Sequence, residues 1–190
     1  MPRRCNLSTS DPADGSGFET VTDADEAAIH QQLGRPPRAV RAVAARCPGG
    51  HPAVIQTNPR LANGTPFPTL YYLTCPQLTS LVGTLESAGH MREMTARLAT
   101  DAELAAAYQR AHEDYLAQRD ALESLGTEVS AGGMPQRVKC LHVHLAHTLA
   151  CGRSRNPFGD ETAELLAAQW PDEPCVAGLR RGREYNSARL

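Results

Sequence analysis

Residues 39–57, AVRAVAARCPGGHPAVIQT, contain the stretch that decides the predicted fold. Two segments rich in alanine and valine, 39–47 and 53–57, flank a short linker with two prolines and two glycines. Because proline and glycine end strands and favour turns, this pattern predicts a β-hairpin. A third β-type segment, 69–75, follows a loop dense in proline and glycine at 58–68. The three segments predict a small antiparallel meander.

Helical patterns surround this meander. Thr22 or Asp23 is suited to cap a helix over 23–33, which Gly34 would end. After the meander, apolar residues recur at helical spacing, and Asp101 and Asp160 are suited to cap helices. We expect these later helices over residues 77–88, 91–99, 101–125, 135–150 and 160–169. The sequence therefore predicts an α+β fold, in which a three-stranded meander packs against a mostly helical C-terminal part.

The length and composition suit one domain with its own core. A chain of 190 residues buries enough surface to fold without staples. Residues 1–20 are polar and rich in serine, aspartate and glycine, so we expect a disordered tail. The arginines after residue 176 predict a flexible basic tail over 177–190. A single α+β domain is then expected over 21–176.

The charge balance argues against two classes of partner. Nineteen basic residues against twenty-one acidic ones give no overall attraction to nucleic acid or to an anionic membrane. No apolar run approaches the length of about 20 residues that a membrane-spanning helix needs. The first 18 residues also lack the apolar segment of a secretory signal. We therefore expect a cytoplasmic protein.

Cysteine is the residue type most informative about chemistry. A cytoplasmic chain of this size does not need disulfides, so its thiols indicate metal binding, catalysis or burial. Composition alone leaves these three roles open. The six cysteines are Cys5, Cys47, Cys75, Cys140, Cys151 and Cys175.

The predicted helix 135–150 carries the densest group of metal-ligand side chains. At about 100° per residue, Cys140, His144, His147 and Cys151 would fall within one sector of about 60°. Thiolate and imidazole are the preferred ligands of zinc, but one straight helix cannot complete a tetrahedron. The alternative interpretation is a polar helix face without metal.

Three further cysteines lie where regular structure should end. Cys47 and Cys75 each close a predicted strand and precede a proline, and Cys175 follows Pro174. Adjacent strand ends in a meander would bring Cys47 and Cys75 together. With Cys140 and Cys175 they would supply four thiolates, enough for an iron–sulfur cluster or a structural zinc ion. Buried inert thiols are the alternative.

Other motifs are weaker. Arg60, Arg137 and Lys139 are candidates for an anion-binding pocket, although ordinary surface charge is the commoner explanation. Residues 156–160 first indicate a turn and a helix cap. The chain has no Walker loop, no GxGxxG after a strand, no GxSxG elbow and no HExxH helix.

The same segments resemble an uncharacterised bacterial family, domain of unknown function 501. The resemblance rests on residues 47–49, 57–60, 64–71, 75–76, 139–142 with His147, and 156–160. It implies that Cys140, His142 and His147 belong to the family motif, whereas His144 and Cys151 are features of this chain. This favours the dispersed cysteines and adds His142 as a candidate ligand. Members are often encoded beside a septum-formation protein and an exopolyphosphatase, which implies a cytoplasmic housekeeping role.

Three functional hypotheses follow. The first is a metal- or cluster-binding protein that uses Cys47, Cys75, Cys140 and Cys175, with His142 or His147 as an additional ligand. The second is an enzyme without metal, in which His144 or His147 activates Cys140 as a nucleophile. The third is a non-catalytic adaptor with a protein partner in cell division or polyphosphate metabolism.

Overall fold

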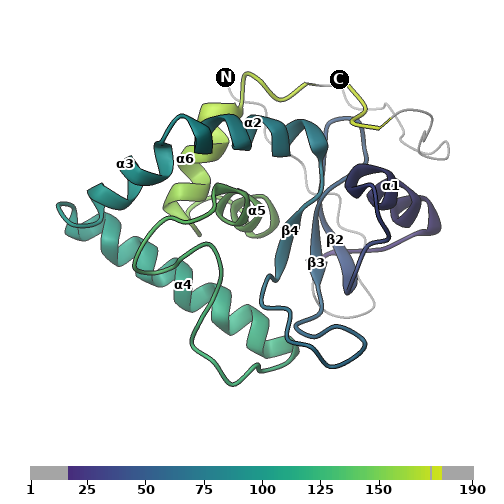
Figure 1. Ribbon diagram of the computed structural model, residues 1–190, viewed down its shortest axis with the longest axis horizontal. Helices are drawn as coiled ribbons and strands as arrows, with labels where there is room; N and C mark the ends of the chain where they lie inside the picture. Colours follow the sequence, from purple (N-terminus) through teal and green to yellow (C-terminus); the bar gives the residue numbers. More distant parts are fainter. Residues whose placement is uncertain (1–16, 172, 177–190) are drawn as a thin grey trace.

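The computed structural model describes residues 17–171 and 173–176. It has a mixed α+β fold in which α1 lies on one side of the strands and the other helices lie on the opposite side (Figure 1). No described helix is both long and apolar enough to cross a membrane. The described elements are β1 (Glu19–Thr20), α1 (Asp23–Leu33), β2 (Val40–Arg46), β3 (Pro52–Thr57), β4 (Tyr71–Leu73), α2 (Pro76–Ser87), α3 (His90–Arg97), α4 (Ala102–Leu122), α5 (Leu141–Cys151) and α6 (Pro157–Leu166).

The sheet has four antiparallel strands in the order β1-β2-β3-β4, so the prediction of three strands was one short. The extra strand β1 pairs with β2 and lies in residues predicted to be a disordered tail. Two contacts anchor it: the ring of Phe18 packs edge-on against Tyr71 at 5.9 Å, and Glu19 pairs with Arg46 at 2.6 Å. A two-residue strand is too short to show a period-2 pattern, which is why these tertiary contacts were needed to reveal it. Residues 1–16 of the predicted N-terminal tail and the predicted tail at 177–190 lie outside the described residues.

The three predicted strands form the meander, and its topology brings the ends of two strands and the start of the third to one edge of the sheet. Because β3 is antiparallel to both β2 and β4, the ends of β2 and β4 meet the start of β3 at the same edge. Cys47 directly follows β2, His51 directly precedes β3, and Cys75 lies two residues after β4. Local sequence thus places three metal-ligand side chains at one edge.

Helix α1 has the predicted bounds because its start is capped from both directions. The Thr22 hydroxyl accepts from the Asp25 amide, and the Asp25 carboxylate accepts from the Thr22 amide. Asp25 also pairs with Arg46 of β2 at 2.7 Å. Burial alone would raise the pKa of Asp25, but the hydrogen bonds from Arg46 and Thr22 outweigh it and lower that pKa.

Helix α5 begins at Leu141, so the predicted start at Pro135 was wrong. The preceding segment turns at Gly132 and Gly133, whose φ angles are 66° and 91°. The Lys139 amide donates to the Gly132 carbonyl at 2.7 Å, which closes this turn instead of continuing a helix. Cys140 is therefore the N-cap of α5 and not a member of a helical stripe.

Helix α6 also begins earlier than predicted, at Pro157 instead of after Asp160. The Asn156 side chain caps it by accepting from the Gly159 amide at 3.1 Å. Gly159 lets α6 approach α5 closely, because a Cβ there would clash with the carbonyl of His144. The two helices therefore pack backbone to backbone, and Asn156 enters the core between them.

Candidate metal centres

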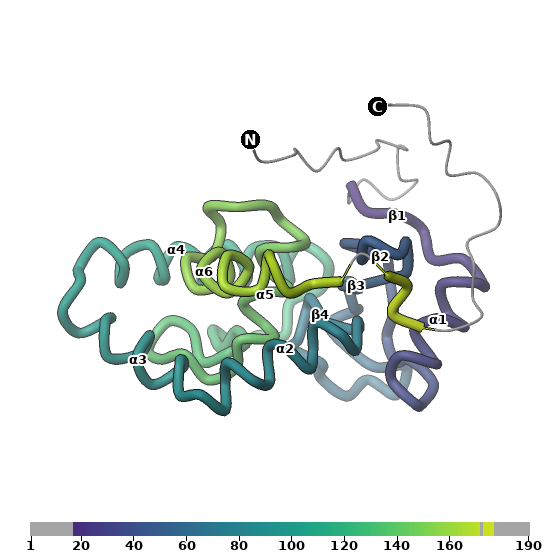
Figure 2. Tube along the Cα trace, turned by 90° about the horizontal axis from the view of Figure 1, so that it is seen from above, coloured from purple at the N-terminus to yellow at the C-terminus, as the bar shows by residue number. Residues whose placement is uncertain are grey.

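Four side chains from three segments lie at the edge of the sheet where β2 and β4 end. Cys47 and His51 come from the β2–β3 turn, Cys75 is the N-cap of α2, and Cys175 comes from the segment after α6. That C-terminal segment runs from α6 past the sheet towards α1 (Figure 2). We call Cys47, His51, Cys75 and Cys175 the thiol cluster.

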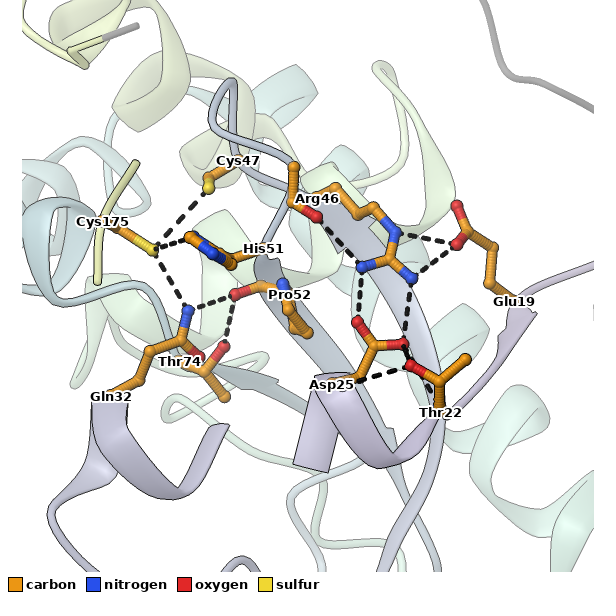
Figure 3. Close-up of polar contacts among 11 residues, drawn as sticks. Glu19, Thr22, Asp25, Gln32, Arg46, Cys47, His51, Pro52, Thr74 and Cys175 are labelled. Atoms are coloured by element: carbon orange, nitrogen blue, oxygen red, sulfur yellow. Dashed lines mark hydrogen bonds and ion pairs between the residues drawn. The ribbon is translucent and has the colours of Figure 1, made fainter. Parts of the chain in front are cut away.

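The distances in the thiol cluster are those of groups that share one small space. Cys175 Sγ lies 3.7 Å from Cys47 Sγ and 3.7 Å from His51 Nδ1 (Figure 3). The Cys75 thiol interacts with both other thiols. Cys75 is 0% exposed, Cys47 4% and His51 6%, and Cys175 is half-buried. The cluster is thus closed to solvent on most sides.

The tight turn between β2 and β3 sets the positions of Cys47 and His51. The Cys47 amide donates to the His51 carbonyl at 2.9 Å, and the Gly50 amide donates to the Cys47 carbonyl at 2.8 Å. Gly49 faces the C-terminal segment, and a Cβ there would clash with the Pro174 Cα and lie 2.8 Å from the Pro174 nitrogen. Glycine at this position therefore allows residues 173–175 to lie against the turn and deliver Cys175.

The three thiols compete for a single negative charge. Hydrogen bonds from the Cys175 and Cys75 thiols, helped by the His51 and Gly49 amides, lower the pKa of Cys47 to about 2. Interaction with Cys47 and Cys75, together with burial, raises the pKa of Cys175. Cys175 favours the Cys75 thiolate, but Cys47 and burial outweigh this and raise the Cys75 pKa. A bound cation would lower the pKa of the remaining thiols and allow them to ionise.

Polar side chains brace the thiol cluster from outside (Figure 3). Gln32 Nε2 donates to Cys175 Sγ at 3.2 Å and to the Pro52 carbonyl at 2.7 Å. On the other side of the turn, Arg46 Nη1 donates to the Gly50 carbonyl at 3.1 Å. These contacts fix the positions of the turn and of the C-terminal segment relative to each other.

A second group of metal-ligand atoms lies between α2 and α5. Within residues 17–171 and 173–176, Glu86, Cys140 and His142 place one ligand atom each within 4.8 Å of the others, as do Cys47, His51 and Cys175. His142 Nδ1 lies 3.8 Å from Cys140 Sγ and 3.1 Å from Glu86 Oε1. Interaction with Cys140, and then with Glu86, raises the pKa of His142 to about 9 against the effect of burial. We call these three residues the Glu86 cluster.

The structure therefore divides the ligand set that the sequence predicted as one site. It brings Cys47, Cys75 and Cys175 together, whereas the meander argument concerned only Cys47 and Cys75, and it does not bring Cys140 to them. Cys140 lies with His142 in the Glu86 cluster, because the turn at Gly132 and Gly133 sets where α5 begins.

His147 belongs to neither cluster. It is fully buried, with Nε2 3.1 Å from Asp114 Oδ2 and Nδ1 3.4 Å from the Asn156 amide nitrogen. The same amide nitrogen lies 3.1 Å from His144 Nδ1. Burial lowers the pKa of His147 and lowers that of His144 to about 3. Both imidazoles are neutral members of a core hydrogen-bond network. The imidazole beside Cys140 is that of His142, not that of His144 or His147 as the enzyme hypothesis required.

The three residues considered for an anion pocket do not converge. Arg60 pairs with Glu123, just beyond the C-terminal end of α4, at 2.8 Å. The Arg137 carbonyl accepts from Tyr108, 15 residues earlier on that helix, which corresponds to a rise of about 22 Å. The side chains of Arg137 and Lys139 are exposed near that earlier position.

Sequence reasoning missed two of the candidate ligands, His51 and Glu86. His51 was assigned only to a turn, although the spacing Cys47-x₃-His51 is itself a signal that a tight turn can present two ligands to one ion. Nothing in the sequence around Glu86 marks it, because its role depends on how α2 packs against α5.

The family assignment rests on one comparison. A family model described as "Protein of unknown function (DUF501)" matches residues 43–164, so the chain belongs to this family. No curated protein and no solved structure matches the chain. The matched region contains the whole Glu86 cluster and three residues of the thiol cluster, and Cys175 lies beyond it.

Proposed function

We propose that this protein binds one zinc ion through Cys47, His51, Cys75 and Cys175, and that this metal has a structural role. The observation that carries the proposal is the convergence of the Cys47, His51 and Cys175 ligand atoms within 4.8 Å of one another, with the buried Cys75 thiol interacting with both other thiols. Three cysteines and one histidine form a common ligand set of structural zinc.

Two distances among Cys47, His51 and Cys175 fit a single tetrahedral ion. Zinc bonds of about 2.3 Å to sulfur and about 2.0–2.1 Å to nitrogen give ligand separations of about 3.8 Å for S···S and about 3.6 Å for S···N. The corresponding distances are 3.7 Å for Cys47–Cys175 and 3.7 Å for Cys175–His51. In a [4Fe–4S] cluster the cysteines would stand further apart, because each binds a different iron.

The predicted consequence of binding is a cross-link between distant parts of the chain. Cys47 and His51 belong to the β2–β3 turn, Cys75 to the start of α2, and Cys175 to the C-terminal segment. One ion would therefore fasten the sheet to the helical layer and hold residues 173–176 in place. Four protein ligands leave no position for substrate, which favours a structural role over a catalytic one.

Elemental analysis of protein purified without oxygen tests this proposal. We expect zinc in the wild-type protein and one equivalent less in the double variant Cys47→Ser/Cys175→Ser. Cys151→Ser is the matched control. Cys151 is also a half-buried cysteine, but its thiol contacts Gln118 and it belongs to neither cluster. Cobalt substitution should also give the intense sulfur-to-metal absorption of three thiolates. A folded wild-type protein that contains no metal, or one whose Cys47 and Cys175 form a disulfide, would refute the proposal.

A further inference from the structure

The Glu86 cluster has features that the thiol cluster lacks. Glu86 comes from the last turn of α2, Cys140 is the N-cap of α5, and His142 lies in the first turn of α5. The side chains of Glu86 and His142 are 22% and 26% exposed, and Cys140 is also half-buried. These side chains are therefore partly accessible to solvent.

Two of the three interatomic distances lie near those expected around one tetrahedral ion, and the three ligand atoms lie within 4.8 Å of one another. The zinc bond lengths predict about 3.6 Å for S···N and about 3.4 Å for N···O. The distances are 3.8 Å from Cys140 Sγ to His142 Nδ1 and 3.1 Å from His142 Nδ1 to Glu86 Oε1. Small side-chain adjustments would complete the fit.

The other nitrogen of His142 is already oriented as in metal sites. His142 Nε2 donates to the Thr79 carbonyl at 3.3 Å. Metal-ligating histidines commonly donate their second ring N–H to a backbone carbonyl or a carboxylate, which fixes the tautomer and leaves the first nitrogen's lone pair for the metal. Nδ1 lies beside Glu86 and Cys140, and a bound ion would take the place of the proton that Nδ1 shares with them.

We propose that Glu86, Cys140 and His142 bind a second zinc-type divalent ion with one open coordination position. One carboxylate and one thiolate balance the two charges of the ion, and neutral His142 is the third ligand. Three protein ligands and an exposed fourth position are the arrangement of zinc sites that bind water or a small anion. This site is independent of the thiol cluster, with which it shares no residue.

Glu86 also has a structural role, which the test must separate from metal binding. Its Oε1 accepts from the Leu141 amide at 2.7 Å, which stabilises the start of α5. The variant Glu86→Gln keeps an oxygen that can accept this hydrogen bond but removes the charge that a metal needs. If capping is the whole role of Glu86, this variant should bind metal as the wild type does.

Cobalt titration of metal-free protein, with azide as the small-anion probe, tests the proposal. We expect two equivalents to bind, one with three-thiolate absorption and one with weaker single-thiolate absorption. Azide should change only the second spectrum, since only that site has an open position. The variants Cys140→Ser, His142→Ala and Glu86→Gln should each weaken the second site by more than about 100-fold, because even losing a supporting contact costs roughly 10–100-fold.

The control Cys151→Ser should retain both equivalents. A wild type that binds no equivalent with the single-thiolate spectrum, or two unchanged equivalents in the three variants, would overturn the second site. Azide sensitivity that survives in all three variants would overturn it as well. The two sites have different spectra. Absence of the three-thiolate spectrum would show that the thiol cluster does not bind metal, and absence of the single-thiolate spectrum would show the same for the Glu86 cluster.

Discussion

The thiol cluster and the Glu86 cluster use similar chemical groups in different surroundings. The former combines three thiols with one imidazole, and Cys47, His51 and Cys75 are almost completely buried. The latter has one thiol, one imidazole and one carboxylate, all half-buried. Ligand type alone does not separate a closed site from an open one. The number of ligands and their exposure separate them, and both depend on which elements meet.

The largest expected effect comes from Cys75→Ser. Cys75 is a proposed zinc ligand and is fully buried at the junction of β4 and α2. We therefore expect the thiol cluster of this variant to lose its zinc. With free zinc 1,000-fold above its Kd, the lost binding lowers the free energy of unfolding by about 4 kcal/mol. At this chain length that corresponds to a fall in Tm of about 8–16 °C, measurable by calorimetry.

Cys151→Ser is again the matched control for Cys75→Ser. A Cys75→Ser protein that melts at the wild-type temperature with its zinc content unchanged would remove the structural role assigned to the thiol cluster. The Glu86 cluster should keep its metal in this variant, which tests whether the two sites are independent.

The variant His147→Gln probes a buried histidine that we place outside both clusters. It loses the hydrogen bond to Asp114 and the stacking of the imidazole on Tyr71 at 5.9 Å. We expect the free energy of unfolding to fall by about 2–3 kcal/mol, as for other disrupted buried networks. Metal analysis should show the wild-type content. A lower metal content in folded His147→Gln would place His147 among the ligands after all.

Acid should destabilise the wild type more than His147→Gln. Burial lowers the pKa of His147, so between pH 6.5 and that lowered pKa the unfolded chain takes up a proton that the folded chain does not. The contribution of neutral His147 is complete above pH 6.5 and declines as pH falls through this window, by at most about 1.4 kcal/mol per pH unit.

Urea unfolding of metal-free wild type and His147→Gln at several pH values measures this difference. Removing metal beforehand prevents proton competition at the zinc ligands from contributing to the slope. Parallel stability curves for the two proteins between pH 6.5 and 4 would contradict the assignment of His147 as a buried neutral imidazole.

The smallest expected change in stability comes from Gly49→Ala. The added Cβ would meet the backbone of Pro174, so residues 173–175 must shift and carry Cys175 with them. We expect a loss of about 1–2 kcal/mol, as for other overpacked sites, and zinc binding at least about 10-fold weaker in the thiol cluster alone. A zinc-competition titration with a chromophoric chelator measures this affinity.

Gly83→Ala is the control, because a Cβ at Gly83 in α2 has no atom within 4 Å. This control should keep its zinc affinity and gain about 0.5–1 kcal/mol of helix stability. Equal zinc affinity in Gly49→Ala and Gly83→Ala would show that Gly49 does not help to position Cys175.

Much of the fold could be predicted from local patterns. The three meander strands and the bounds of α1 follow from apolar segments, turn residues and caps that lie next to one another in the sequence. The start of α5 could not be predicted in this way, because it depends on the turn at Gly132 and Gly133. The start of α6 does have a local signal, the Asn156 cap followed by Pro157, but the cap was assigned to Asp160 instead.

For the candidate sites, the sequence by itself determined the chemistry and part of the geometry. It supplied thiols and imidazoles, and the antiparallel meander necessarily brings the segments that carry Cys47 and Cys75 to one edge. Only the tertiary structure decided that Cys175 joins them, that His51 completes the set, and that Cys140 pairs with His142 and Glu86. The physical reason is that strand pairing follows from short-range patterns, whereas the approach of a distant segment depends on close contacts such as Gly49 against Pro174.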